Sequence, residues 1–189
     1  MKWQGHVNKI CKSISRNIFL LSKLKPFIDT DARKIFYNAQ IKSHIDYAST
    51  IWDGSSHVHL KELNSLHRRA AKHILPDKTL TTDQKLKKLQ ILPLDQHLLF
   101  NKGVVMFKVW NKSVPDYLSV LFKRQETRYP TSRLNFNIPL PRIDIYKTSL
   151  SFSGPSFWNT LPSSIKSVGT ISSFKANLQK HLLTNCSDH

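Results

Sequence analysis

Histidine is the residue type in this chain whose spacing most invites a chemical reading. His57 and His59 stand two apart, and His67 and His73 follow in the same stretch. Imidazole is a common zinc ligand, but a zinc site needs a full set of nitrogen, sulfur or carboxylate ligands. No cysteine and no Asp- or Glu-rich partner set completes this one. The sequence therefore favours surface or phosphate-facing histidines, and we predict no metal site.

Groups that serve in nucleophilic or acid–base catalysis are not arranged for it here. The stretch 153–156, SGPS, lacks the glycines that a nucleophile elbow needs two residues before and two residues after its serine. Cys11 and Cys186 have no supporting motif, and a helix N-cap explains the pair Asp29 and Asp31. Only five glycines are present, so a phosphate-cradling Gly-rich loop is not expected. We predict no catalytic residue and no cofactor.

Positive charge is the strongest chemical signal of the chain. Its 189 residues carry 29 Lys and Arg against 12 Asp and Glu, a formal net charge of +17, and the pI is near 10.1. At this balance a polyanionic partner is the first hypothesis, with nucleic acid ahead of an anionic membrane. Charge alone does not separate the two, because a basic amphipathic helix suits phosphates and a charged bilayer surface equally well.

The first cationic face belongs to a helix predicted over residues 3–24. Its apolar face holds Val7, Ile10, Ile14, Ile18, Leu21 and Leu24. Lys12, Arg16 and Lys23 fall on the opposite face together with Phe19. Two readings of Phe19 stay open: it packs against a second surface, or it stacks on an unpaired base.

The segment from residue 37 to residue 75 predicts two amphipathic helices joined by a turn at residues 53–56, and the rest of the chain is organised around this hairpin. The first helix has a stripe of Tyr37, Ile41, Ile45, Ala48 and Trp52, widened by Phe36, Tyr47 and Ile51. The second places Leu63, Leu66, Ala70 and Ile74 on one face, and Lys61, Arg68 and Lys72 on the other with Arg69 at its edge. One side of this second helix should pack and the other is cationic.

The second half of the chain changes in composition and apolar periodicity near residue 123. Before that point, residues 94–110 are dense in apolar side chains and predict a central helix, in which Gly103 indicates a close helix crossing or a weak spot. Residues 123–133 carry Arg124, Arg128 and Arg133 with little apolar periodicity and predict a basic linker. Beyond it, alternation over 134–140 and 150–153 predicts a short β-hairpin, and the last helix follows.

These patterns predict a mainly α protein with three parts. Residues 1–122 form a helical body, 123–133 the basic linker, and 134–189 a small α+β appendage with the short β-hairpin. No apolar run near the start is long enough for a secretory signal or a membrane span, and two cysteines suit a reducing compartment. We expect an intracellular protein, nuclear or cytoplasmic. The basic first 28 residues share their composition with mitochondrial presequences, but they also make a good structural helix.

An ordered set of short motifs resembles the region that follows the palm in reverse transcriptases of non-LTR retrotransposons (LINE, jockey and CR1 types). The set begins with Trp3 and His6-Val7, which look like the signature after the last palm strand. It continues with Tyr37, Ile41, His44-Ile45-Asp46-Tyr47-Ala48, Trp52, Leu63, Leu66-His67-Arg68-Arg69-Ala70, Ile74, Leu92-Pro93-Leu94-Asp95, Val114-Pro115-Asp116-Tyr117-Leu118, the stretch 133–141, Trp158-Asn159-Thr160-Leu161-Pro162 and Phe174-Lys175. Each piece is degenerate, and their order carries the specificity.

This resemblance implies a thumb-like helical bundle and the region after it, without fingers, palm or endonuclease. Polymerases of the family hold Mg²⁺ on an adjacent Asp pair, and this chain contains no Asp-Asp. We therefore expect no polymerase activity from the chain alone, and Mg²⁺ only in the full-length polymerase. The implied partners are RNA, DNA or an RNA–DNA hybrid, and the missing palm and fingers of a longer protein.

The cationic faces and the resemblance together predict one set of nucleic-acid-binding residues, which would contact phosphates without reading sequence. The set is Lys12, Arg16, Lys23, Lys61, Arg68, Arg69, Lys72, Arg124, Arg128 and Arg133. Two alternatives stay open. The chain is a cationic helical module for an anionic membrane or a partner protein, or it is an inactive relic of a mobile element.

Overall fold

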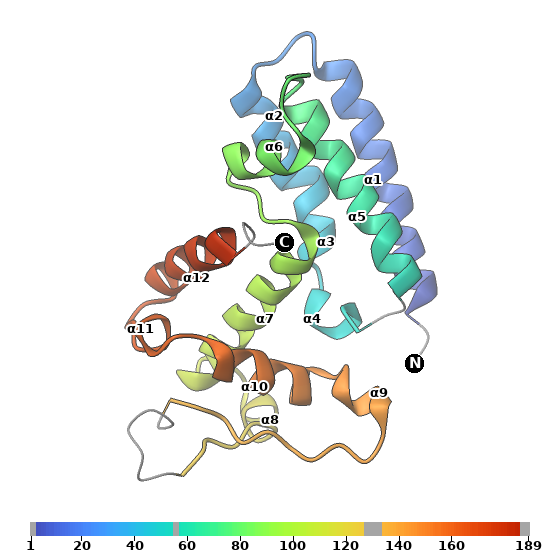
Figure 1. The fold of residues 1–189 in the computed structure, drawn as a ribbon. Helices are drawn as coiled ribbons and strands as arrows, with labels where there is room; N and C mark the ends of the chain where they lie inside the picture. Colours follow the sequence, from blue (N-terminus) through green and yellow to red (C-terminus); the bar gives the residue numbers. More distant parts are fainter. Residues whose placement is uncertain (1–2, 55–56, 127–133, 186–189) are drawn as a thin grey trace. The chain divides into compact units, whose positions relative to one another are not determined.

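The structure is a computed structural model that describes residues 3–54, 57–126 and 134–185 (Figure 1). It is mainly helical, which confirms the predicted fold class at that level. The chain divides into two compact units, Met1–His97 and Leu98–His189. Each has its own buried core and is described by itself.

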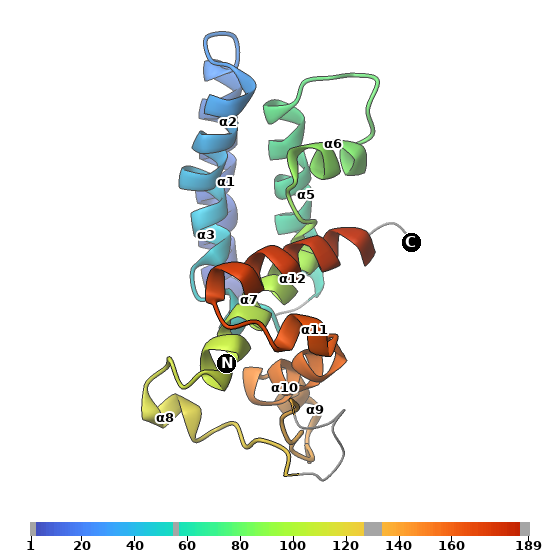
Figure 2. The ribbon, with the colours of Figure 1, turned by 90° about the vertical axis from the view of Figure 1, so that its left-hand side faces the viewer.

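The first unit is built from helices alone in its described part. In chain order they are α1 (Gln4–Leu24), α2 (Thr30–Tyr37), the π-helix η1 (Asn38–Lys42), α3 (Ser43–Asp46), α4 (Ser49–Trp52), α5 (His57–Ile74) and α6 (Thr82–Leu89), after which α7 (Leu94–Trp110) begins. Helix α1 runs beside α5 (Figure 1) and also packs on η1 and α3 (Figure 2). Helix α2 packs on α5, and α6 packs on α5 as well.

The buried face of α1 confirms the sequence prediction at five of six positions. Val7, Ile10, Ile14, Ile18 and Leu21 are buried, and Cys11 joins them. Leu24 is the exception, with 39% of its side chain exposed. The physical reason is its place in the last turn of α1, where the chain leaves the bundle for the turn before α2. On α5, all four predicted core residues, Leu63, Leu66, Ala70 and Ile74, are buried.

The first helix of the predicted hairpin is not one continuous α-helix. The π turn of η1 inserts an extra residue, and Ala48 adopts a left-handed conformation with φ 51°, which ends α3 and starts α4. Trp52 Nε1 donates to the Tyr47 carbonyl at 2.8 Å across this break. Tyr37, Ile41, Ile45 and Trp52 are buried as predicted, but Tyr47 and Ile51 are 71% and 56% exposed, because the break rotates them out of the stripe.

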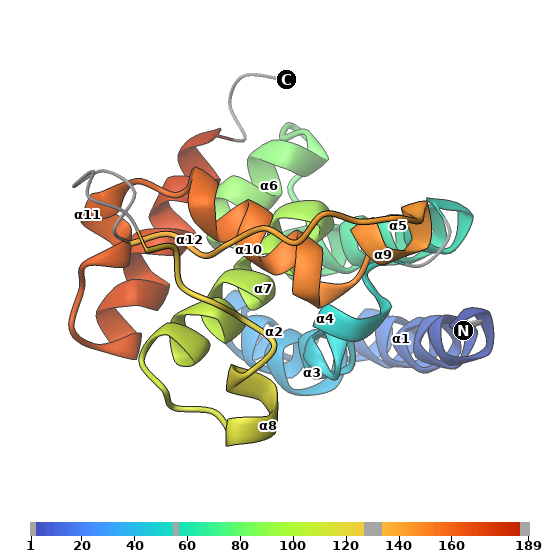
Figure 3. The ribbon, with the colours of Figure 1, turned by 90° about the horizontal axis from the view of Figure 1, so that it is seen from below.

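The second unit gathers its helices around an aromatic core. After α7 come α8 (Asp116–Ser119), α9 (Asp144–Lys147), α10 (Leu150–Thr160), α11 (Ser163–Lys166) and α12 (Ile171–Asn185). Trp158 of α10 is fully buried, with the Trp110 and Phe174 rings stacked at centroid distances of 5.9 and 5.8 Å. Phe136 meets the same ring at 5.9 Å, and the chain that carries it runs along α10 (Figure 3).

The predicted β-hairpin of the appendage is absent from the described residues. Its second strand is wrong, since residues 150–153 form the first turn of α10. The serines that alternate there bond back along the helix, as Ser153 Oγ does to the Ser149 carbonyl at 2.8 Å. Of the first strand, Phe136 alone pairs, in an isolated antiparallel bridge with Arg124. A run of four residues is too short to separate a period of 2 from a period of 3.6, and this explains the error.

The predicted linker does not separate two bodies in the described structure. Gln125 N–H donates to the Asn135 carbonyl at 2.9 Å, and Asn137 N–H donates to the Lys123 carbonyl at 2.8 Å, so both ends of the linker belong to the second unit. Residues 127–133 lie outside the described part of the chain. The division between the units falls at His97 and Leu98, rather than near residue 122.

Candidate nucleic-acid interface

The outer face of α1 is a continuous cationic stripe. None of the 21 residues of α1 is acidic, and Lys12, Arg16 and Lys23 are exposed opposite the buried face, as the helical spacing predicts. Lys9 is exposed on the same stripe, one turn before Lys12. The sequence prediction omits Lys9, although the same 100° wheel places it there. From Lys9 to Lys23 the stripe is about 21 Å long at 1.5 Å per residue.

The outer face of α5 is a second cationic surface, but one of its predicted members, Arg68, is paired within the fold. Lys61, Arg69 and Lys72 are exposed opposite the buried residues of the helix. The Arg68 guanidinium instead donates two hydrogen bonds to the Asp83 carboxylate of α6, Nη1 to Oδ1 at 2.6 Å and Nη2 to Oδ2 at 3.0 Å. This pairing lowers the pKa of the Asp83 carboxyl and raises the pKa of Arg68. Arg68 therefore joins α5 to α6, and its charge is compensated.

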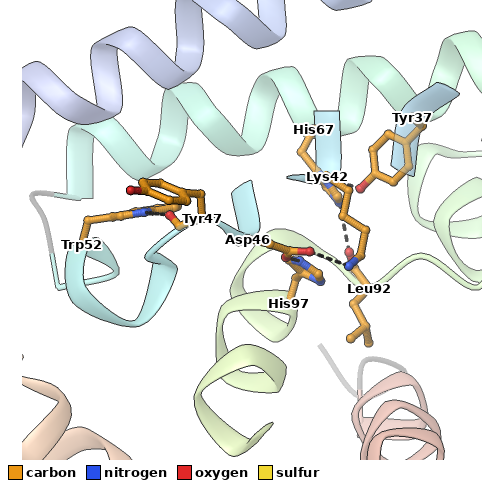
Figure 4. Close-up of polar contacts among 8 residues, drawn as sticks. All are labelled: Tyr37, Lys42, Asp46, Tyr47, Trp52, His67, Leu92 and His97. Carbon is orange, nitrogen blue, oxygen red and sulfur yellow. Dashed lines mark hydrogen bonds and ion pairs between the residues drawn. The ribbon is translucent and has the colours of Figure 1, made fainter. Parts of the chain in front are cut away.

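Several carboxylates of the first unit serve helix caps or ion pairs, while Asp31 and Glu62 are exposed. Asp29 caps α2 by accepting from Ala32 N–H at 2.7 Å. Asp46 accepts from Lys42 Nζ at 2.7 Å and from His97 Nε2 at 2.5 Å (Figure 4). Within the described part of the chain, no ion pair involves Lys9, Lys12, Arg16 and Lys23 of α1 or Lys61, Arg69 and Lys72 of α5, whereas Arg68 pairs with Asp83.

His67 holds the inner side of α5 in place and does not face solvent. Its side chain is buried between Tyr37 and the Leu92 carbonyl (Figure 4). Because a carbonyl only accepts, Nε2 carries the proton and donates to Leu92 at 3.0 Å, which leaves Nδ1 to accept from the Tyr37 hydroxyl at 3.2 Å. Burial lowers the pKa of His67 to about 4, so the ring is neutral near pH 7. The prediction of a surface or phosphate-facing histidine is wrong here.

The remaining histidines give no metal site in the described structure. His73 is partly exposed, and its pKa is lowered by burial and by the nearby charges of Lys25 and Arg69. The side chains of His57 and His59 lie outside the described part of the chain. Among the side chains that the structure describes, no group of three or more His, Cys, Asp or Glu is placed to hold a metal ion.

Arg124 is the one described member of the predicted cationic linker set, and it belongs to the second unit. Its guanidinium lies over the Trp110 ring, 4.3 Å from the ring centroid, and donates to the Trp110 carbonyl. Arg128 and Arg133 lie outside the described residues. The predicted set therefore divides into the α1 stripe, the α5 face, the internal Arg68 and a separate Arg124.

Comparison with protein-family models, with curated proteins and with solved structures found no match to this chain. No helix in the described residues is long and apolar enough to cross a membrane.

Proposed function

We propose that this chain binds nucleic acid through the phosphate backbone, with the outer faces of α1 and α5 as its contact surfaces. The observation that carries the proposal is the outer face of α1, where Lys9, Lys12, Arg16 and Lys23 follow one another on a helix without a single acid. Such a row positions a polyanion by charge and geometry and carries no base readout. Lys61, Arg69 and Lys72 extend the same chemistry to α5.

The motif order supports a more specific role, that of the thumb and following region of a non-LTR retrotransposon reverse transcriptase. In that role the bundle follows an RNA–DNA hybrid while another part of the polymerase performs the chemistry. The sequence agrees with a binding role, since it contains no adjacent Asp pair for two-metal phosphoryl transfer. Intracellular localisation and partnership with a palm and fingers belong to the same proposal.

The direct test is the affinity of the purified chain for a labelled RNA–DNA hybrid at about 0.1 M salt. We expect Lys12→Ala/Arg16→Ala/Lys23→Ala to bind on the order of 100-fold more weakly, because three phosphate contacts and their counterion release are lost. The matched control removes the same charge from exposed lysines of the second unit, Lys108→Ala/Lys175→Ala/Lys180→Ala. Equal loss in both variants would mean that only net charge matters and would contradict the proposed surface.

A further inference from the structure

One exposed phenylalanine lies among the cations of α1, and a second lies in the turn directly after this helix. Phe19 is 57% exposed and Phe27 is 83% exposed. The helical turn continues past the end of α1, since Lys25 N–H donates to the Leu21 carbonyl and Phe27 N–H to the Leu24 carbonyl, both at 2.9 Å. Arg16, Phe19 and Lys23 follow one another at helical spacing on α1, Phe27 lies in the turn directly after it, and we call these four residues the α1 strip.

The α1 strip alternates flat apolar surfaces with positive charges. Lys23 Nζ lies 5.4 Å from the centroid of the Phe19 ring, a cation–π contact that is weak at an exposed site. A planar group can take the face of this ring while Lys23 turns to a phosphate. Aromatic platforms interleaved with cations are the arrangement by which proteins hold single strands, because every unpaired base has a free face for stacking. Bases inside a duplex are already stacked on their neighbours.

We propose that the α1 strip binds unpaired nucleotides of a single-stranded nucleic acid, with bases stacked on Phe19 and Phe27 and phosphates paired with Arg16 and Lys23. The inference rests on the proposed nucleic-acid function and deepens it by naming the form of the ligand at this part of α1. It takes up the base-stacking reading of Phe19, whose side chain is 57% exposed.

The distribution of side chains on α1 favours a nucleic acid over a membrane surface. A helix that lies in a bilayer interface separates its apolar face from its cationic face. On α1 the apolar face, which includes Ile14 and Ile18, is already buried in the bundle, while the exposed rings share one stripe with the cations. Leu20 and Leu24 flank that stripe at 50% and 39% exposure. The alternation along the stripe matches a chain of bases and phosphates.

The test compares a fluorescein-labelled oligothymidylate, which has no base pairing, with a blunt DNA duplex, using the full chain. We expect Phe19→Ala and Phe27→Ala each to weaken binding of the single strand about ten-fold, and binding of the duplex less than about two-fold. The slope of affinity against salt should not change, because no phosphate contact is removed. The matched control is Tyr117→Ala, which removes a 78% exposed ring from α8. Phe19→Trp should keep binding, and Phe19→Leu should lose it as Phe19→Ala does.

The outcomes separate the inference from the function on which it rests. If Phe19→Ala/Phe27→Ala changes single-strand and duplex binding alike, or neither, the inference is wrong. The proposed function still stands in that case, provided Lys12→Ala/Arg16→Ala/Lys23→Ala weakens binding. If the ring variants instead reduce binding to vesicles of mixed phosphatidylserine and phosphatidylcholine and leave the oligothymidylate unaffected, the strip contacts membranes and the inference is also overturned. If neither the charge variants nor the ring variants change the binding affinity, both proposals are wrong.

Discussion

The Arg33 guanidinium hydrogen-bonds to carbonyls at the ends of two other helices of the first unit. Its Nη2 donates to the carbonyls of Lys25 and Ile28 at 2.8 and 2.7 Å, and its Nη1 donates to the carbonyl of Ile74 at 3.2 Å. Carbonyls at the last turn of a helix have no partner within that helix and carry the negative end of its dipole. One guanidinium therefore serves the end of α1, the loop after it and the end of α5.

We expect Arg33→Ala to lower the free energy of unfolding by about 2 to 4 kcal/mol, because charged hydrogen bonds at partly buried carbonyls are lost together. Arg33→Lys should recover only part of this, since an ammonium cannot reproduce the planar fork. The measurement is the midpoint of urea unfolding, with Lys34→Ala as the neighbouring control. A loss for Arg33→Ala no larger than that of Lys34→Ala would disprove the capping role.

His67 makes the first unit sensitive to acid. Burial lowers the folded-state pKa from the ordinary 6.5 to about 4, so between these values the unfolded chain binds more protons than the folded chain. Stability is complete above pH 6.5 and falls as the pH drops through this window. The loss approaches about 3 kcal/mol below pH 4, from roughly 1.4 kcal/mol per pKa unit.

His67→Gln isolates this effect, because an amide can still donate to the Leu92 carbonyl and does not titrate. We expect the stability difference between the natural chain and His67→Gln to be constant above pH 6.5 and to move in favour of the variant as the pH falls to 4. Urea unfolding at several pH values measures it. A difference that stays constant across the whole range would show that His67 is not buried as a neutral ring.

At the scale of the elements, Gly103 decides how closely the helices of the second unit approach. A Cβ at this position of α7 would lie 2.7 Å from Leu178 Cδ2 of α12 and 3.1 Å from Phe157 Cε1 of α10. Leu178 is fully buried and has little room to move. Of the two readings of Gly103 in the sequence, the close helix crossing is therefore confirmed.

We expect Gly103→Ala to destabilise the chain by about 1 to 3 kcal/mol through overpacking, although alanine favours a helix by about 1 kcal/mol over glycine. Gly5→Ala in α1 is the matched control, since nothing lies within 4 Å of the added methyl group. This control should be neutral or stabilising by up to about 1 kcal/mol. Thermal unfolding of both variants measures the contrast, and a stabilising Gly103→Ala would refute the close crossing.

Helix faces could be read from the sequence where burial follows an unbroken period of 3.6 residues, as on α1 and α5. The break at Ala48 could not be predicted from the sequence, because a π turn and a left-handed residue leave no periodic signal. Tyr47 and Ile51 still fit the period of the apolar stripe. The exposure of Lys12 follows from the same period. The ion pair of Arg68 does not follow from the helical period, because its partner Asp83 lies fifteen residues away on another helix.

At the scale of the whole molecule, charge is spread over both units, and the longest acid-free helix of the described residues, α1, lies in the first. Met1–His97 holds 17 of the 29 Lys and Arg and 8 of the 12 acids, so both units are basic. Helix α12 also lacks acids and has a buried face, so what distinguishes α1 is its row of four exposed cations, Lys9, Lys12, Arg16 and Lys23, against Lys175 and Lys180 on α12. A polyanion that recognises only net charge would not discriminate between α1 and the lysines of α12.

The measurement that tests the central claim most directly is the dependence of hybrid affinity on salt concentration. A phosphate-binding surface predicts a straight log–log plot with a slope steeper than about −3, and each lost contact should flatten it by about 0.9. Lys12→Ala/Arg16→Ala/Lys23→Ala should therefore flatten the slope by about 2 to 3 units, and the control triple of the second unit should leave it nearly unchanged. A shallow slope in the natural chain, or equal flattening by both triples, would contradict the account.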